Sequence, residues 1–195
     1  MDWANLLQVI YRCLLALLTI YYLYKKEYKV MRAVFLNLML SFVPLLLSRL
    51  FHIDIDLFSI WAYYIVTIMS LYLGSSLGFY DQYRWWDRTI HAFSGIAFVG
   101  FGLAIADRGS ESTKWLLLLF SFTFSITIHA FWEMLEYITD SVTHSDGQRW
   151  QKIHKSRNHV SPKAMQPAGL VDTMNDIICC MIGSAAAVIV WEMIL

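Results

Sequence analysis

The sequence predicts an all-α, polytopic membrane protein, a single domain (residues 1–195) built as a bundle of six transmembrane helices. Of its 195 residues, 58% are hydrophobic and only 15% are charged, whereas about 25% are charged in a typical soluble domain. The mean hydropathy is +0.50. The apolar residues also form six blocks long enough, at about 1.5 Å of helix per residue, to cross a hydrocarbon core about 30 Å thick.

We place the six spans where polar connections separate the apolar blocks, at 5–24, 31–50, 57–80, 89–106, 114–140 and 170–194. The first block has no basic region before it and no small-residue cleavage site, so we expect a membrane helix and not a signal peptide. The third and fifth blocks are longer than the bilayer requires, so these helices must tilt or project. The first four connections are short, which predicts antiparallel neighbours. The fifth, 141–169, is a polar loop with two prolines and two glycines.

The distribution of basic residues predicts the orientation of the chain, because cytoplasmic loops carry an excess of Lys and Arg. The even-numbered connections carry three basic residues, Arg49, Arg108 and Lys114. The odd-numbered connections carry eleven, namely Lys25, Lys26, Lys29, Arg32, Arg84, Arg88, Arg149, Lys152, Lys155, Arg157 and Lys163. We therefore expect cytoplasmic odd connections and both termini outside. The net charge is zero, which gives no general attraction for nucleic acid.

Eight ionisable residues lie in or at the ends of the last three spans, where charged side chains are rare. The fourth span has one acid and one histidine, the fifth has four such residues and the sixth has two acids: Asp87 and His91; His129, Glu133, Glu136 and Asp140; Asp172 and Asp176. Within each span the spacing is three or four residues, which puts each set along one face of its helix.

The predicted topology brings these eight residues to one side of the membrane. The fourth and sixth spans enter from the cytoplasm and the fifth leaves into it, so all three sets lie near the cytoplasmic leaflet. A charged residue in the middle of a bilayer costs about 2.5 kcal/mol or more, which makes a chance cluster improbable. Small residues at Ser94, Gly95 and 183–185 would let the helices approach closely. We expect the eight side chains to converge.

Six carboxyl groups and two histidines in an apolar setting require protonation, basic partners or a bound cation. Arg88 is the only base nearby on these helices, although loop residues could fold over the site. Oxygen and imidazole ligands without thiolates favour Mg²⁺ or Mn²⁺, or a dinuclear Mn, Fe or Zn site. The predicted metal ligands are therefore His91, His129, Glu133, Glu136, Asp172, Asp176, Asp87 and Asp140.

Simpler interpretations exist for several of these residues. His91 or His129, taken singly, could be hydrogen-bonded to a neighbouring helix. Asp87 and Asp140 could be solvated at the interface, and Asp172 could cap the start of the sixth span. Glu133 and Asp176 lie deeper, so a functional role is the stronger interpretation there. The cysteines have no metal or redox spacing and are expected to be buried thiols.

The blocks "WWDRTIHAFSG", "HAFWEMLEYITD" and "AGLVDTMNDIICCMIGS" resemble the YjdF-like bacterial membrane proteins. Their pattern is D-x-x-x-H, then W-E-x-x-E, then D-T-x-x-D before a small-residue helix. The resemblance covers roughly residues 80–190 and implies a six-span protein of the bacterial plasma (inner) membrane. It implies no reaction. A fainter similarity to VanZ-like proteins rests on an acid and a histidine at the start of a helix.

Two functions fit these observations, and the sequence leaves both open. The first is a metal-dependent hydrolase or transferase acting on a lipid-linked phosphate or ester, with Glu133 or Glu136 as general base. The second is a transporter or channel in which the same carboxylates bind a cation or relay protons. Against transport, we find no inverted repeat and expect no span interrupted by Gly or Pro at its middle. A purely structural cluster is a third possibility, and the oligomeric state is open.

Overall fold

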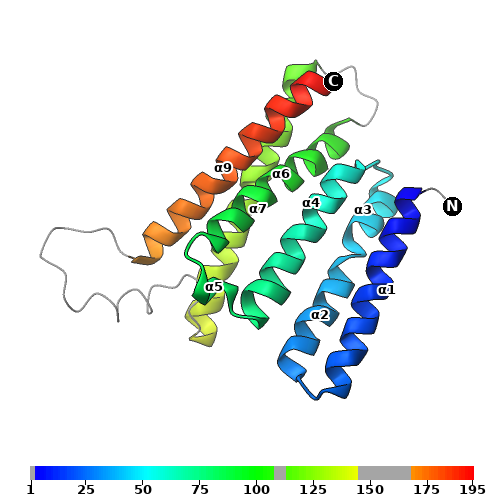
Figure 1. Cartoon of the computed structure of the whole chain (residues 1–195). Coiled ribbons are helices and arrows are strands. Elements are labelled where there is room, and N and C mark those ends of the chain that lie inside the picture. Colours follow the sequence, from blue (N-terminus) through cyan, green and yellow to red (C-terminus); the bar gives the residue numbers. More distant parts are fainter. Residues whose placement is uncertain (1–2, 108–112, 145–167) are drawn as a thin grey trace, which may run out of the picture.

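The computed structural model describes residues 3–107, 113–144 and 168–195, and within these ranges the chain forms helices and no strand (Figure 1). Six helical stretches are long and apolar enough to cross a membrane: Asn5–Tyr24, Tyr28–Phe51, Leu57–Ser76, Trp86–Ala106, Lys114–Thr143 and Gly169–Ile194. The predicted fold class is therefore confirmed. Successive spans run up and down. We call the end that holds the first turn and α5 the turn end, and the opposite end, where α1 begins and α9 ends, the terminal end.

The first span is α1 (Trp3–Tyr24), and the second is broken into α2 (Tyr28–Leu40) and α3 (Val43–Phe51). The predicted span at 31–50 lies within the span Tyr28–Phe51, but its helix is interrupted at Ser41 and Phe42. Pro44 lies in the first turn of α3, and proline has no backbone N–H to donate to the carbonyl group of Leu40, four residues earlier. Hydrogen bonds from Tyr63 and Tyr64 compensate at this break, as described below. The expectation that no span contains a proline break is corrected as well.

The third span begins as α4 (Leu57–Thr67) and ends as the π-helix η1 (Ile68–Ser76). Asp56 caps α4, since its carboxylate accepts the backbone N–H of Ser59 at 2.9 Å. The predicted boundary at residue 80 was too far along the chain. Gly78 adopts a left-handed conformation with φ +78°, which ends the span, and a separate short helix, α5 (Phe79–Gln82), follows.

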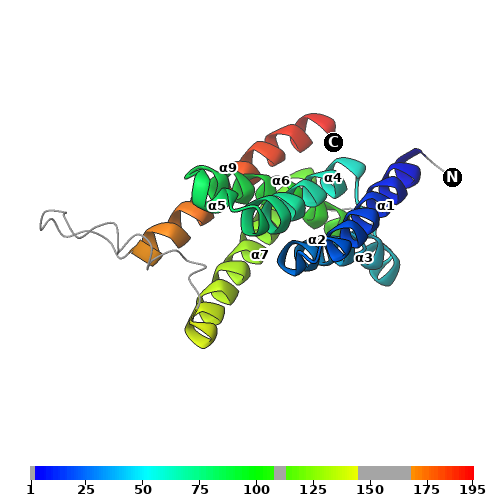
Figure 2. The same ribbon diagram turned by 60° about the horizontal axis from the view of Figure 1, so that its bottom comes forward.

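The last three spans are α6 (Trp86–Ala106), α7 (Lys114–Thr143) and α9 (Ala168–Ile194). α6 lies at the centre and packs against α4, α7 and α9. Glycines allow the close approach of α6 and α9: a Cβ atom at Gly95 would overlap the carbonyl oxygen of Cys180, and one at Gly183 would overlap that of Ala92. Figure 2 shows α7 and α9 diverging at the turn end.

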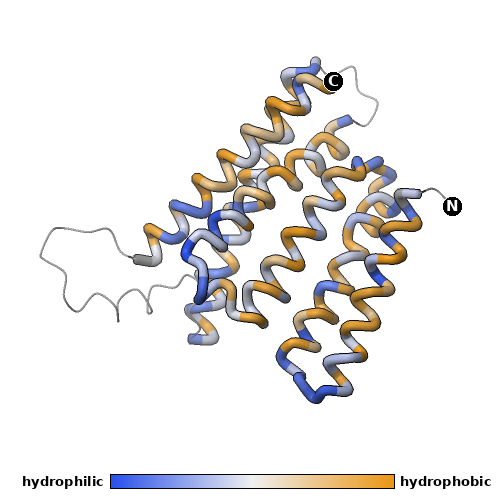
Figure 3. The backbone as a smooth tube through the Cα atoms, viewed as in Figure 1, coloured by the Kyte–Doolittle hydropathy of each residue, from blue (hydrophilic) through white to orange (hydrophobic). Residues whose placement is uncertain are grey.

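The predicted loop at 141–169 is shorter than expected at both ends, because α7 continues to Thr143 and α9 begins at Ala168. The rest of that loop lies outside the described residues, together with Arg108 and the loop's basic and histidine residues, Arg149, Lys152, His154, Lys155, Arg157, His159 and Lys163. The described basic residues of the first and third connections lie at the turn end. Figure 3 shows hydrophilic positions at that end and apolar positions along the spans.

Two apolar clusters hold the spans together. One lies between α4 and α6 and contains Ala62, Tyr63, Tyr64, Ala97 and Phe101. The other joins α6, α7 and α9 nearer the terminal end, and its buried residues are Val99, Leu103, Leu118 and Ala187. We call this second set the apolar plug, because it lies farther along the same three helices that carry the ionisable residues.

Candidate metal centre

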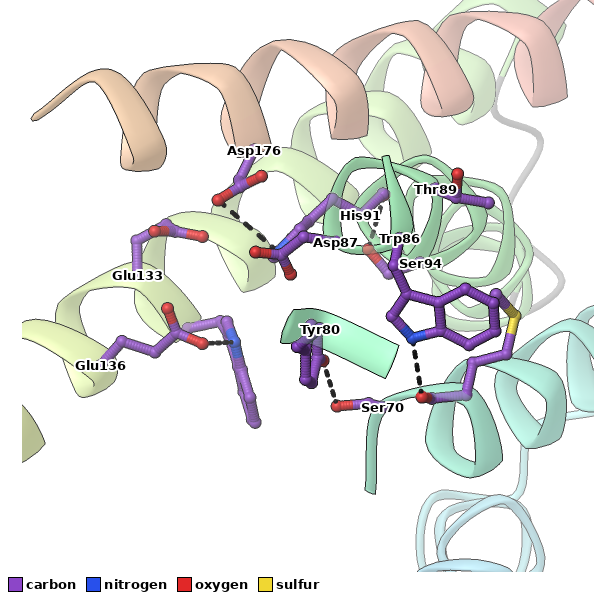
Figure 4. Close-up of polar contacts among 12 residues, drawn as sticks. Ser70, Tyr80, Trp86, Asp87, Thr89, His91, Ser94, Glu133, Glu136 and Asp176 are labelled. Carbon is purple, nitrogen blue, oxygen red and sulfur yellow. Dashed lines mark hydrogen bonds and ion pairs between the residues drawn. The ribbon is translucent and has the colours of Figure 1, made fainter. Parts of the chain in front are cut away.

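His91 occupies the middle of a cluster formed by α6 and α9. Its Nε2 atom lies 3.3 Å from Oδ1 of Asp87, one turn earlier on α6. The same atom lies 3.8 Å from Oδ2 of Asp176 on α9 (Figure 4). His91 and Asp176 are buried, whereas Asp87 is partly buried. The close packing at Gly95 and Gly183 is what brings α9 near enough for Asp176 to reach His91.

α7 contributes a second pair, His129 and Glu133, one turn apart. Their side chains are 3% and 5% exposed, and Nε2 of His129 lies 3.4 Å from Oε1 of Glu133. The imidazole ring of His129 meets that of His91 edge-on, with 4.6 Å between the ring centroids and 84° between the planes. Figure 4 shows the carboxylate of Glu133 on the side of α7 that faces His91. Five predicted ligands thus converge from three helices.

These five residues form two groups that could hold a metal ion. One group is His91, His129 and Glu133, and the other is Asp87, His91 and Asp176. Within each group the candidate ligand atoms all lie within 4.8 Å of one another. Both groups share His91. An ion at either group would have His91 as one of its ligands.

The donor atoms suit a cation. Nε2 of His129 and Oε1 of Glu133 are buried, and neither has a hydrogen-bond partner in the part of the chain that the structure describes. Buried polar atoms are almost always paired, so two such atoms side by side call for an explanation. A cation between them would bind a lone pair of each. Imidazole and carboxylate ligands without thiolates suit a Mn, Fe or Zn ion. A structural zinc site, by contrast, usually contains cysteine ligands.

Glu136, Asp140 and Asp172 belong to neither group, although the sequence analysis placed them in the site. Glu136 is partly buried and accepts a hydrogen bond from the indole N–H of Trp132 at 2.7 Å. Asp140 is buried and Asp172 is partly buried. Along α7, His129 and Asp140 are separated by eleven residues, or about 16 Å. The cluster therefore extends along the helix and does not lie at one level.

Two of the simpler interpretations are corrected by the structure. Asp172 does not cap the sixth span, because α9 begins at Ala168 and Asp172 lies in its second turn. The cysteines are not uniformly buried: Cys13 is exposed, Cys179 is partly exposed and Cys180 is buried. His144 ends α7 as its C-terminal cap and lies well away from His129.

Sequence reasoning missed a line of buried hydroxyl groups that continues from the site. Ser121, Ser125, His129 and Glu133 follow one another at intervals of four residues, and all are buried on α7. The hydroxyl of Ser125 lies 2.9 Å from that of Ser184 on α9 and donates to the carbonyl oxygen of Gly95 at 3.1 Å. The four-residue spacing was the available signal. The line ends at the apolar plug, since Leu118 precedes Ser121 by one turn.

The π-helix forms a wall on another side of the site. Its carbonyl group at Met69 accepts the indole N–H of buried Trp86 at 3.2 Å. The hydroxyl of Ser70 pairs with that of Tyr80 from α5 at 3.0 Å (Figure 4). Short π-helical segments are frequent at functional sites. Here the Met69 carbonyl holds the start of α6, and the Ser70 hydroxyl holds α5, against the third span.

The fold and the site together define a polytopic, six-span membrane protein with a buried histidine and carboxylate cluster that could hold a metal ion. The chain belongs to the family of predicted membrane proteins designated DUF2238, which matches residues 6–195. No curated protein and no solved structure gave a significant match. The family assignment covers all six spans and supplies no reaction.

Proposed function

We propose that this protein is a metal-dependent membrane enzyme, a hydrolase or transferase acting on a lipid-linked phosphate or ester at the cytoplasmic leaflet of a bacterial plasma membrane. The observation that carries the proposal is the pair of buried ligand atoms on His129 and Glu133, which lie 3.4 Å apart and make no hydrogen bond within the described residues. They face His91, which two carboxylates already flank. Each of the two groups offers three nitrogen or oxygen ligands that suit a divalent ion.

The depth of the site supports a lipid-linked substrate. His91 lies five residues after the start of α6, or about 8 Å along the helix, which is near the level of the lipid headgroups. Trp85 and Trp132 are about half exposed on this part of the bundle, and exposed tryptophans are typical of the membrane interface. A substrate with its reactive group in the headgroup region could reach the site without leaving the membrane.

The residues of the proposed site have separate roles. His91, His129, Glu133, Asp87 and Asp176 hold the ion, and a bound metal would polarise a substrate oxygen and lower the pKa of water. Glu133 serves as a ligand, so Glu136 is the remaining candidate for the general base. The indole of Trp132 orients the Glu136 carboxylate through its hydrogen bond. The buried hydroxyls of Ser125 and Ser184 fix the spacing of α6, α7 and α9 behind the ligands.

A cation or proton transporter is the alternative, and the break between α2 and α3 favours it. Broken spans occur in transporters, where the exposed backbone helps to bind the substrate. The apolar plug argues for the enzyme instead, because the line of polar residues from the site ends there and does not continue across the bundle. Transport would require the plug to open.

The test is metal content and metal-dependent stability of the full-length protein in detergent. The wild-type protein should contain a stoichiometric ion and lose thermal stability on chelation, by about 2.7 kcal/mol where the metal is at a hundredfold excess over its Kd. Glu133→Gln keeps the shape but removes the charge, so it should contain no ion and not respond to chelator.

The matched control is Glu136→Gln, one turn away on the same helix and outside both ligand groups. It should retain the ion and the response to chelator. In an activity assay with an identified substrate, it should be inactive. A metal content of Glu133→Gln equal to that of the wild type would refute the site. Indifference of the wild type to both chelator and added metal would do the same, and would favour a proton-sharing cluster.

A further inference from the structure

A second polar cluster lies on the other half of the bundle, around Arg12 of α1. Its Nη2 atom donates to the side chain of Gln8 at 3.2 Å, to the carbonyl oxygen of Ser41 at 3.0 Å and to the hydroxyl of Tyr64 at 2.9 Å. The guanidinium group also lies 4.7 Å from the centre of the Phe42 ring. Arg12 lies seven residues into the first span, beside the break in the second.

Part of this arrangement repairs the break. Pro44 leaves the carbonyl group of Leu40 without its helical donor, and the hydroxyl of Tyr63 donates to it at 3.3 Å. The carbonyl group of Ser41 accepts from Arg12 and from Tyr64, the latter at 2.9 Å. Every contact of Arg12 named so far is with an electrically neutral group. The hydrogen bonds satisfy the carbonyl groups but do not neutralise the positive charge of Arg12.

Arg12 forms no ion pair with any of the residues that the structure describes. The helix dipoles do not supply a counterion. The negative end of α2 and the positive end of α3 meet at the break, and each is worth about half a charge, so they cancel. The Nε–H group of Arg12 is also buried and has no acceptor in this part of the molecule. A whole positive charge with an unused donor is therefore left within the apolar span.

We propose that Arg12 binds a small monovalent anion, of the size of a halide or formate, at the break between α2 and α3. An anion there would accept the free Nε–H and neutralise a charge that is expensive in an apolar setting. The packing favours a small ion, because Asn37 and Ser41 at the end of α2 are each 1% exposed or less.

Arg12 is partly buried and lies seven residues into the span that begins at Asn5, or about 10 Å along the helix. The test below therefore includes a phosphate-containing lipid beside the small soluble anion. This anion site is separate from the proposed metal centre on α6, α7 and α9, and does not depend on it.

The experiment uses bromide and chloride with the full-length protein. Crystals grown in bromide should show an anomalous peak within hydrogen-bond distance of Nε of Arg12. In gluconate buffer, added chloride should raise the melting temperature of the wild type to a plateau. Arg12→Gln should melt independently of chloride, whereas Arg32→Gln, which changes an exposed arginine at the turn end, should respond as the wild type does.

Absence of bromide at Arg12 in well-ordered crystals would overturn the proposal. So would the same chloride response in wild type and Arg12→Gln, because the stabilisation would then come from general salt effects. If Arg12→Gln does not fold, the bromide measurement on the wild type decides alone. Stabilisation by phosphate-containing lipid and not by chloride would contradict the assignment to a small soluble anion.

Discussion

Tyr63 and Tyr64 are adjacent residues whose hydroxyl groups make different numbers of hydrogen bonds near the break in the second span. Tyr63 makes one long hydrogen bond, to Leu40. Tyr64 is 1% exposed and lies among Arg12, Gln8 and Ser41, with its ring stacked on that of Tyr11. Removing the second hydroxyl therefore leaves more polar groups without partners than removing the first.

We predict that Tyr64→Phe lowers the free energy of unfolding by about 1–3 kcal/mol, because buried groups lose their partner. Tyr63→Phe should cost less, about 0.5–1.5 kcal/mol, as expected for one hydrogen bond. Thermal unfolding in detergent compares the two variants with the wild type. An equal or greater loss in Tyr63→Phe would show that the cluster at Arg12 does not depend on the Tyr64 hydroxyl.

At the scale of residues, helix spacing predicted part of the convergence that the structure shows, and metal binding by any of the eight residues stays a prediction. His91, His129, Glu133 and Asp176 were found from their spacing on three helices, and the structure brings them together. Spacing alone gave no way to exclude Glu136, Asp140 or Asp172, which share the same helix faces but lie nearer the turn end. Helix periodicity reports the direction of a side chain, whereas convergence also depends on where neighbouring helices cross.

At the scale of elements, the contact between α6 and α9 depends on two glycines, Gly95 of α6 and Gly183 of α9, each of which packs against the other helix. Gly183 meets the backbone of Ala92, and Gly95 meets the backbone of Cys180. The added methyl group of Gly183→Ala should force the helices apart and cost about 1–3 kcal/mol of stability. Because Asp176 would move away from His91, metal affinity should fall as well.

The matched control for this prediction is Ala186→Leu, which adds more volume on the exposed side of α9. It should change stability by no more than about 0.5 kcal/mol and leave metal affinity unchanged. Thermal unfolding and metal titration measure the two effects. A Gly183→Ala protein as stable as the wild type would mean that α6 and α9 do not pack as closely as described.

The interruptions of the second and third spans were the elements least predictable from sequence. The blocks at 31–50 and 57–80 are continuously apolar, so hydropathy gives no sign of a break at Ser41 or of a π-helix after Thr67. Pro44 was a local signal, but a proline in a membrane helix is tolerated where neighbours satisfy the backbone. Those neighbours, Arg12 and Tyr64, lie on other helices and are far away in the sequence.

At the scale of the whole molecule, the six-span architecture followed from composition and block length alone, because the bilayer fixes the length of each helix. The orientation in the membrane remains a prediction. A reporter fused after Leu195 should lie outside the cell, and one inserted between residues 145 and 167 should lie in the cytoplasm. Accessibility of each reporter to an impermeant reagent measures this. The reverse pattern would move the metal centre to the outer leaflet and point to envelope lipids as substrates.

The apolar plug has an electrical consequence. In a membrane protein the transmembrane voltage falls mainly across the layer that excludes water and ions, and here Val99, Leu103, Leu118 and Ala187 form such a layer beyond the metal centre. An ion that reached the proposed site from the turn end would stop before it. Carrying two elementary charges through the full field would involve about 4.6 kcal/mol per 100 mV, at about 2.3 kcal/mol per charge. A divalent ion at the proposed site would cross only a small part of that field, so its occupancy should be nearly the same in an energised and a de-energised cell.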